Sequence, residues 1–424
     1  MAINFIWINN HLKSYQVRFI ILGFTRKIGI IFLKSGGIIM FQLSKEELEK
    51  LGAEITTREI HQEPELWEEL LASFTAQEKA IKEFISQING RVRVIFTGAG
   101  TSQYVGDTLV PYLNQKADTN RFIFHSYATT DIVASPLDYL FPDEPTLLVS
   151  FARSGNSPES IAAVKLANQL VKDCYHLAIT CAKEGQLAQL CQKDEHSYVF
   201  LMPERSNDAG FAMTGSFSCM YLATLLLFDQ TALEEKQDYV HQAEVMANQV
   251  YDNEATLQAI VDQPFERIIY LGSGCLAGLT REAQLKVLEL TAGKIATVFD
   301  SSMGFRHGPK SFINEKALVF GFVNNQPYTR QYDVDILNEI YRDGIAKQVT
   351  ALTQENDLNY EGQSFVFDSK VILPSGYLVL PYIVFAQTIA LLTSVKIGNL
   401  PDTPSPTGTV NRVVKGVTIH EYQA

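Results

Sequence analysis

The stretch that decides the fold reads VIFTGAGTS and occupies residues 94–102. Its first four residues are apolar or β-branched, which predicts a short strand. Gly98 and Gly100 then predict a tight turn, and a helical pattern follows. A second stretch has the same plan: TLLVSF at 146–151 predicts a strand, and ARSGNSPES at 152–160 predicts a loop and a helix start. Together these units predict an α/β fold with a parallel sheet.

The two loops form a candidate anion site. Loops that follow parallel strands open at the same edge of a sheet, where open α/β sheets bind ligands. The N–H groups at two helix starts, the serine and threonine hydroxyls, and Arg153 could together hold a phosphate. The alternative is that Ser157 only caps a helix and the glycines only make turns.

The same pattern occurs again in the second half of the chain. IIYLGSGC at 268–275 matches the first strand and glycine loop, and ALVFGFV at 317–323 matches the second strand. The offset is 174 residues for the first pair and 171 for the second, which predicts two related domains. The later half has NNQP at 324–327 and no serine-rich loop, so the first half is predicted to hold the phosphate.

Two further residues are candidates for proton transfer. The segment REAQLKVLELT at 281–291 predicts a helix, and Glu289 lies in an apolar part of it. His307 precedes Gly-Pro, which predicts a loop position. A carboxylate and an imidazole in consecutive elements suit general acid–base chemistry. The alternative is a helix with an ion pair of Glu282 with Lys286 at i, i+4, and an ordinary surface histidine.

Taken in order, these motifs resemble the double sugar isomerase (SIS) domain proteins, which include the isomerase half of glucosamine-6-phosphate synthase. The chain is more similar still to the tagatose-6-phosphate ketose/aldose isomerase family, also described as galactosamine-6-phosphate deaminases. The resemblance covers residues 40–424 and includes NRVVKGVT at 411–418. It implies an α/β fold of two SIS domains, each a three-layer αβα, flavodoxin-like unit with a parallel sheet flanked by helices.

The resemblance also implies roles for individual residues. Glu289 matches the glutamate that moves a proton between C1 and C2 of the sugar, and His307 matches a ring-opening histidine that reaches across a dimer interface. Lys415 matches a lysine that closes over the open-chain sugar. The residues that would bind the substrate are Gly100, Thr101, Ser102, Arg153, Ser154, Gly155, Ser157 and Thr214. Arg153 departs from the pattern, because the synthase has a glutamine there, and residues 210–216 keep only part of the corresponding loop.

The function implied is aldose–ketose isomerisation of a hexose or hexosamine 6-phosphate, with galactosamine 6-phosphate to tagatose 6-phosphate and ammonia as the leading case. A plain isomerase that releases no ammonia and a non-catalytic sugar-phosphate sensor are the alternatives. The presence of Glu289, His307 and Lys415 favours an enzyme. Galacto and gluco stereochemistry both stay open. The chemistry needs no metal or cofactor, and neither is expected.

Composition and charge restrict the partners and the cellular compartment that are expected for the protein. The net charge of −12 argues against a nucleic-acid partner, so the anionic sugar must be held by local donors. Five widely spaced cysteines predict reduced thiols and a cytoplasmic protein. The resemblance implies a homodimer or a higher homo-oligomer as the assembly, and no membrane association is expected.

The predicted domain plan has six parts. They are residues 1–39, an extension; 40–88, a helical segment; 89–235, the first SIS domain; 236–263, a linker helix; 264–400, the second SIS domain; and 401–424, a catalytic tail. The extension has five Lys and Arg residues and no acidic residue, and Gly36-Gly37 could be encoded by a ribosome-binding sequence just before Met40. We therefore expect residues 1–39 to be upstream sequence read from a wrong start; a membrane-associating arm is the alternative.

Overall fold

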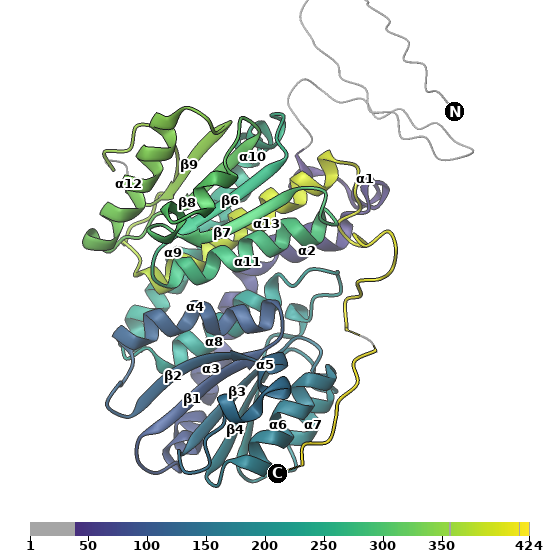
Figure 1. Cartoon of the computed structure of the whole chain (residues 1–424), viewed down its shortest axis with the longest axis vertical. Coiled ribbons are helices and arrows are strands. Elements are labelled where there is room, and N and C mark those ends of the chain that lie inside the picture. Colours follow the sequence, from purple (N-terminus) through teal and green to yellow (C-terminus); the bar gives the residue numbers. More distant parts are fainter. Residues whose placement is uncertain (1–38, 356–357, 415, 424) are drawn as a thin grey trace, which may run out of the picture.

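The computed structural model describes residues 39–355, 358–414 and 416–423. Figure 1 shows two α/β domains stacked along the long axis of the molecule, with the C-terminus at the end of the first domain. Each domain contains one parallel sheet of five strands with helices on its faces, which confirms the predicted fold class. Lys415 and residues 1–38 of the predicted extension lie outside the described residues.

The first sheet has the strand order β2-β1-β3-β4-β5, and all its neighbouring strands are parallel. Its strands are β1 (Val92–Gly98), β2 (Phe122–Ala128), β3 (Thr146–Ala152), β4 (Cys174–Thr180) and β5 (Ser197–Leu201). Its helices are α4 (Thr101–Lys116), α5 (Thr129–Ala134), α6 (Pro158–Leu170), α7 (Gln186–Cys191) and α8 (Gly215–Phe228), with short 3₁₀ turns η2 (Pro136–Asp138) and η3 (Glu204–Ser206). Every residue of β1 and β3 is buried, as expected for central strands of a covered parallel sheet.

The second sheet, read from the other side, has the equivalent order β7-β6-β8-β9-β10. Its strands are β6 (Arg267–Gly272), β7 (Ala296–Ser301), β8 (Ala317–Phe322), β9 (Gln348–Thr353) and β10 (Gln363–Val366). Its other elements are α11 (Cys275–Leu290), α12 (Pro327–Asp343), η4 (Gly304–Arg306) and η5 (Pro309–Phe312). Gly100 and Gly274 have nearly the same backbone angles, φ 58° and ψ −129° against φ 62° and ψ −130°, so the two glycine turns share one conformation.

The remaining helices pack around and between the two sheets. They are η1 (Met40–Gln42), α1 (Lys45–Leu51), α2 (Glu54–His61), α3 (Glu63–Ser86), α9 (Leu233–Asp252), α10 (Glu254–Val261) and α13 (Ser375–Lys396). The single linker helix predicted within residues 236–263 is instead two helices, α9 and α10, because the helix breaks at Asn253. Asn253 leaves helical geometry, with φ −103° and ψ 18°, and its side-chain amide donates to the Gln249 carbonyl at 2.8 Å.

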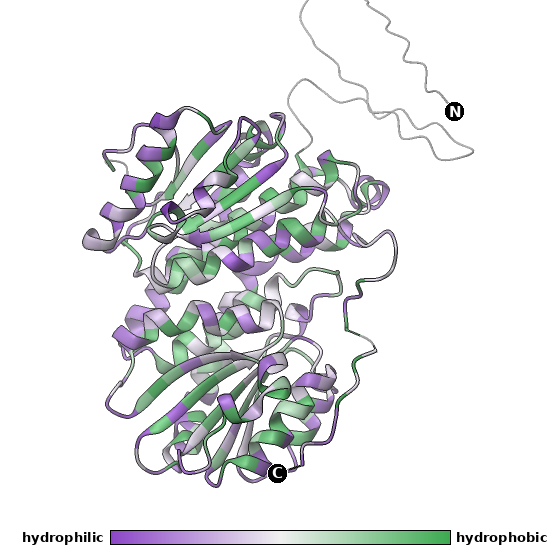
Figure 2. Ribbon diagram, viewed as in Figure 1, coloured by the Kyte–Doolittle hydropathy of each residue, from purple (hydrophilic) through white to green (hydrophobic). Residues whose placement is uncertain are grey.

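The apolar residues form a core that continues from one domain to the other. In Figure 2 the strands are coloured mostly as hydrophobic, whereas outer helices such as α12 carry many hydrophilic residues. α13 is long and apolar enough to cross a membrane by length and composition, but 94% of its most apolar window is buried inside the protein. Core helices of water-soluble proteins pass the same test, so α13 is explained as a core helix.

Helices α4 and α11, one from each domain, pack directly against each other. Gly278 lies at the point of closest approach: a Cβ atom there would be 2.6 Å from the Asp107 carbonyl oxygen and 2.7 Å from the Thr108 Cα. A larger residue would therefore push the helices apart. This contact brings the start of α4, with Thr101, against the charged side of α11.

Candidate active site

The two predicted loops lie at the carboxyl ends of β1 and β3, which are neighbours in the first sheet. Gly100 and Gly155 both have positive φ, 58° and 64°, which favours glycine at both turns. Thr101 and Ser102 are buried in the first turn of α4. The structure thus brings both loops to one edge of the sheet, where the backbone N–H groups of two helix starts are available.

The serines of the second loop also make local hydrogen bonds. Ser157 caps α6, and its Oγ accepts from the Ser160 N–H at 3.4 Å. The Ser154 Oγ accepts from the Asn156 N–H at 3.3 Å. The Ser157 Oγ also lies 2.7 Å from the Ser160 Oγ, and either hydroxyl can be the donor of that bond, so the Ser157 hydrogen can donate elsewhere when Ser160 donates to it. The Ser154 hydroxyl accepts a hydrogen bond and can still donate one. Capping and anion binding are therefore compatible roles for these two hydroxyls.

Arg153 does not extend freely over this edge. Its Nη1 donates to the carbonyl oxygens of Gly210 (3.3 Å), Phe211 (3.2 Å) and Ala212 (3.4 Å). Its Nη2 donates to the Arg412 carbonyl oxygen at 2.8 Å, and 6% of the residue is exposed. Both terminal nitrogens are thus already bound to backbone, so the expected role of Arg153 as a phosphate donor is not supported by this geometry.

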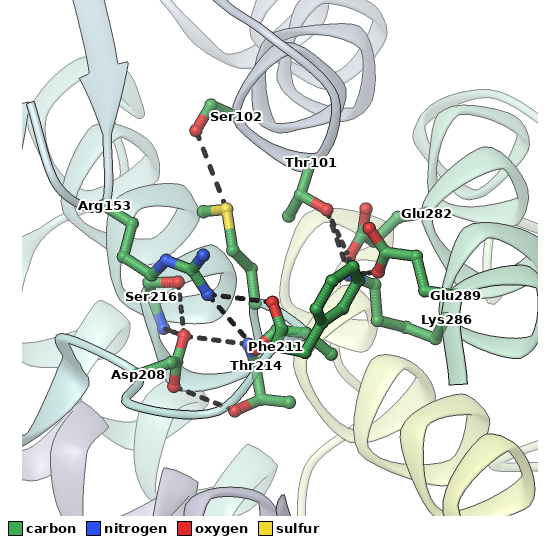
Figure 3. A network of polar contacts seen from close by, with 12 residues as sticks. Thr101, Ser102, Arg153, Asp208, Phe211, Thr214, Ser216, Glu282, Lys286 and Glu289 are labelled. Atoms are coloured by element: carbon green, nitrogen blue, oxygen red, sulfur yellow. Dashed lines mark hydrogen bonds and ion pairs between the residues drawn. The ribbon is translucent and has the colours of Figure 1, made fainter. Parts of the chain in front are cut away.

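Thr214 is also held within the protein. Its N–H and its Oγ1 both donate to the buried Asp208 carboxylate at 2.9 Å, and the Ser216 N–H donates to the same group at 3.0 Å. The Thr214 hydroxyl hydrogen is therefore used by Asp208, as Figure 3 shows. This arrangement makes Thr214 a support of the loop between η3 and α8 rather than a free substrate donor.

A cluster of charged groups lies where α11 faces α4. The Lys286 Nζ is 2.8 Å from the Glu289 Oε2, 3.1 Å from the Glu282 Oε1 and 3.0 Å from the Thr101 Oγ1. Figure 3 shows these side chains converging from the two helices. The ion pair of Glu282 with Lys286 that the sequence suggested is present, and its side chains are 0% and 1% exposed, so the pair is buried. Packing of α4 over this side of α11 is what buries them.

Burial changes the protonation of this cluster. It raises the pKa of the Glu282 carboxyl to about 7, although the nearby Lys286 ammonium opposes the rise. The pKa of Lys286 is also raised: burial disfavours the ammonium ion, but the carboxylates of Glu282 and Glu289 outweigh that effect. Glu282 therefore titrates near neutral pH beside a lysine that stays charged.

Glu289 differs from its two neighbours in being accessible. Its side chain is 25% exposed, and it follows Lys286 by three residues, so both lie on one side of α11. The hydrogen bond from Lys286 fixes one carboxylate oxygen, Oε2, within a low-dielectric region. The geometry leaves Glu289 as the one carboxylate of the cluster that can meet both the protein interior and a bound molecule.

His307 lies in the exposed turn between η4 and η5, after β7. Its N–H donates to the Gly304 carbonyl at 2.8 Å. The turn is tied to α12, because the Glu339 carboxylate pairs with Arg306 at 2.7 Å and with Lys310 at 2.5 Å. The histidine is thus held on a fixed, outward-facing turn, and it does not form part of the buried cluster of Figure 3.

The corresponding edge of the second sheet is filled by a side chain of the protein itself. The Asp333 carboxylate, on α12, accepts hydrogen bonds from the hydroxyls of Ser273 and Ser302, both at 2.5 Å, and from the Asn324 N–H at 3.0 Å. These donors follow β6, β7 and β8, and Asp333 is 2% exposed. The Asp333 carboxyl group thus already occupies the second edge. At the first edge the Glu282 carboxyl group accepts from the Thr101 hydroxyl at 3.3 Å, but no carboxyl group within the described residues bonds to Ser154 or Ser157.

Comparison with known proteins places this arrangement in a family. The SIS domain model matches residues 87–229. D-galactosamine-6-phosphate deaminase AgaS of Escherichia coli O157:H7 is 42% identical over 386 residues, which cover 87% of this chain and 96% of the relative. This chain belongs to the AgaS family of SIS-domain proteins. D-galactosamine-6-phosphate deaminase AgaS of Shewanella sp. (strain ANA-3) is 41% identical over 382 residues, covering 90% of this chain and 95% of the relative.

The structural comparison agrees with the family. The crystal structure of tagatose-6-phosphate ketose/aldose isomerase from Escherichia coli superposes with a TM-score of 0.78 at 40% sequence identity. The match covers 87% of this AgaS-family chain and 97% of the Escherichia coli chain. A crystal structure from Clostridium novyi NT gives a TM-score of 0.86 at 42% identity and covers 90% and 99% of the two chains. The family suspected from the motifs is thereby confirmed.

Several residues of this AgaS-family site were missed in the sequence. The spacing of Glu282, Lys286 and Glu289 at i, i+4 and i+7 indicates that they share one side of a helix. The sequence did not show that this side is buried. The carboxylates of Asp208 and Asp333 accept hydrogen bonds from loops that follow strands, and no local sequence motif indicates this role. Arg412 contacts Asp208 across 204 residues, which no local pattern indicates.

Proposed function

We propose that the protein converts galactosamine 6-phosphate to tagatose 6-phosphate and ammonia, with Glu289 as the proton-transferring base. The observation that carries this proposal is the Lys286–Glu289 pair at 2.8 Å, beside Thr101 at the end of a hydroxyl-rich loop. A partly exposed carboxylate fixed by a buried cation is suited to moving a proton at a bound sugar. The relatives named as deaminase and as ketose/aldose isomerase support the same chemistry.

The proposed reaction begins with opening of the sugar ring. His307 takes the proton of the anomeric hydroxyl and returns one to the ring oxygen, which frees the C1 aldehyde. Glu289 then removes the hydrogen at C2 as a proton, and the electrons of that bond form the C1–C2 double bond of an enolamine. The C1 carbonyl oxygen takes up one proton at this step, and the C2 amino group gives up one when the imine forms. Glu289 returns a proton to C1, which produces an imine at C2. Lys286 keeps its charge throughout and holds the carboxylate oriented.

Water completes the proposed reaction. It adds to the C2 imine carbon, both of its hydrogens pass to the nitrogen, and the nitrogen leaves as ammonia while the water oxygen becomes the C2 carbonyl. The balance is one amino sugar and one water consumed, and one ketose and one ammonia formed. If the substrate carries a hydroxyl at C2, the same proton transfer gives aldose–ketose isomerisation without ammonia. The single base thus serves both reactions, and the C2 substituent decides which one occurs.

We propose that the sugar phosphate is held at the first sheet edge, by the loops of Thr101–Ser102 and Ser154–Ser157. The Ser154 hydroxyl, the Ser157 hydroxyl when Ser160 donates to it, and the N–H groups of two helix starts can donate to it. The Asp333 carboxylate supports this choice, because it repels a second anion at the equivalent edge of the other domain. We therefore expect each chain to bind one sugar phosphate.

Replacing the loop serines should weaken phosphate binding selectively. Ser154→Ala and Ser157→Ala each remove one donor to a charged group, which costs about 1 kcal/mol or more. Titration with the sugar phosphate and kinetics with phosphorylated and plain sugars would measure the loss. Ser273→Ala, at the filled second edge, is the matched control and should leave phosphate affinity unchanged. Equal losses for phosphorylated and plain sugars would place the phosphate elsewhere.

We propose that His307 serves the site of a second chain in a homodimer or a higher homo-oligomer. Its exposed place on a fixed turn supports this assignment. His307→Ala and Glu289→Gln chains, each inactive alone, should then complement each other. After subunit exchange about half of the dimers are mixed, each with one intact site of two, so roughly a quarter of wild-type activity should return. No recovery, with exchange verified by mass, would contradict a shared site.

The cellular setting is part of the same proposal. All five cysteines are free and buried, which fits a reducing compartment, and we place the protein in the cytoplasm.

Ammonia release from purified protein tests the proposed function directly. Galactosamine 6-phosphate should give equal amounts of ammonia and ketose, at a higher kcat/KM than glucosamine 6-phosphate. Saturable binding of both sugars without turnover would instead identify a sensor, and turnover of aldoses alone would identify a plain isomerase.

A further inference from the structure

Arg153 is hydrogen-bonded to two separate parts of the chain. It follows β3 directly, next to Ser154 of the proposed phosphate loop. Its Nη1 holds the carbonyl groups of residues 210–212, and its Nη2 holds the Arg412 carbonyl at 2.8 Å. Its hydrogen-bond partners within the described residues are all backbone carbonyls. A guanidinium with five N–H donors in a fixed plane can bridge several carbonyls in this way, and a lysine ammonium cannot span the same set.

The contact with the C-terminal tail is made from both sides. While Arg153 binds the Arg412 carbonyl, the Arg412 guanidinium donates to the Asp208 carbonyl, at 3.0 Å from Nε, and to the Asn207 Oδ1 at 3.4 Å. The tail is otherwise exposed here: residues 406–412 and 414 are all exposed. In Figure 1 it runs as an extended strap along one side of the first domain. Arg412 is therefore the point at which this stretch is fastened.

The loop that receives Arg412 is itself rigidly supported. The Asp208 side chain accepts from Thr214 and Ser216, and the Glu59 carboxylate on α2 accepts from the Ala209 N–H at 2.6 Å. Burial and the neighbouring Asp208 raise the pKa of Glu59 to about 7, but its hydrogen bonds with the loop do not depend on that value. A tail bound to such a loop takes a defined path over the first domain.

We propose that Arg153 is a positioning residue that latches the C-terminal tail to the phosphate loop through the Arg412 carbonyl. In this role Arg153 orders the strap beside Ser154 and does not bind the phosphate itself. The catalytic consequence rests on the proposed function and on the closing role that the family resemblance implies for the tail. The latch also accounts for the arginine that stands where the synthase sequence has a glutamine, because two separated carbonyl groups must be held at once.

Two variants separate the latch from phosphate binding. Arg153→Lys keeps the positive charge but cannot span both the tail and the loop, and Arg412→Ala removes the tail's hold on Asp208 without touching the interior. Gln169→Ala is the matched control, because it removes only a weak contact at the far end of the tail, 3.4 Å from the Tyr422 carbonyl. Thermal unfolding of each variant shows whether the domains remain folded.

The decisive readout is trypsin cleavage after Lys415 in the substrate-free protein, followed by mass spectrometry. Losing a hydrogen bond from a charged donor, about 1.5–3 kcal/mol, should speed the cleavage roughly 10- to 100-fold in both latch variants. Gln169→Ala should be cleaved at close to the wild-type rate. The affinity of Arg153→Lys for inorganic phosphate should stay within about threefold of wild type, because in this proposal Arg153 binds backbone carbonyls and not the phosphate.

The opposite pattern would overturn the latch. Wild-type cleavage in the folded latch variants, or a large loss of inorganic phosphate affinity in Arg153→Lys, would make Arg153 a phosphate ligand or a purely structural residue. In turnover, Arg153→Lys should lower kcat more than it raises KM, since the tail acts after the phosphate is bound. Cleavage and phosphate binding need no turnover, so they test the latch even if the wild-type protein releases no ammonia.

Discussion

Glu289→Gln is expected to abolish most ammonia release while leaving the fold and the phosphate affinity intact. Removing a positioned general base typically lowers the rate by about 10²–10⁴-fold. The amide oxygen of glutamine can still accept the hydrogen bond from Lys286, which in the wild-type protein is 2.8 Å long, so the cluster should not collapse. The amide cannot take a proton from C2, so the loss should fall on kcat and not on binding.

The measurement for Glu289→Gln is ammonia release together with binding of inorganic phosphate and a melting curve. Unchanged melting and phosphate affinity would show that the variant has lost chemistry alone. Glu289→Asp keeps the carboxylate but withdraws it by one methylene, and should retain more activity than Glu289→Gln. Wild-type turnover by Glu289→Gln would remove Glu289 from the role of base.

Lys286→Met is expected to destabilise the protein more than any other substitution in the site. The Lys286 side chain is 1% exposed and is the cation that both Glu282 and Glu289 share. Removing one partner of a buried ion pair leaves an uncompensated charge and costs about 3–5 kcal/mol. Denaturant unfolding would measure this cost. The rate should fall as well, because Glu289 loses the group that orients it.

A second substitution shows whether the cost comes from the charge. Glu282→Gln in the Lys286→Met background removes the fully buried carboxylate, so it should restore part of the lost stability.

The stability of the wild-type protein should depend on pH in a definite direction. Because burial raises the pKa of Glu282 to about 7, its protonated form favours the folded state, and stability falls as pH rises from its unfolded value of 4.5 through about 7.

In Lys286→Met the Glu282 carboxyl should titrate higher still, so the difference from wild type should grow between pH 6 and pH 8. In Glu282→Gln that titration is absent and the same pH range should have a smaller effect on stability. A stability of Lys286→Met equal to that of the wild-type protein would show that the cluster is hydrated and that the account of its burial is wrong.

The sequence was sufficient for the fold because its signals are local. Strand, glycine turn and helix follow one another within residues 94–102, and the positive φ of Gly100 and Gly274 confirms the turn that those glycines predicted. The sheet edge that gathers the phosphate loops then follows from parallel strand pairing. Glu289 and His307 could be singled out as candidates because their neighbours constrain them to a helix and to a turn.

The parts that the sequence could not predict depend on contacts between distant segments. Glu282 and Lys286 have the spacing of a surface pair, and only the approach of α4 at Gly278 buries them. Arg153 looked like a phosphate donor because its target carbonyls, in residues 210–212 and at Arg412, are 57 to 259 residues away. Asp333 lies 60 residues from Ser273, so the filled second edge was hidden in the same way.

Turnover in deuterium oxide tests the central claim, that Glu289 carries a proton between C2 and C1, most directly. Because the Glu289 side chain is 25% exposed, its acquired proton should exchange with the solvent before it is returned. Galactosamine 6-phosphate should therefore yield a ketose with deuterium in one of the two C1 positions, since one base acts on one face of the enolamine. Deuterium distributed equally over the two C1 positions would contradict a single glutamate base, because one base returns the proton to one face only.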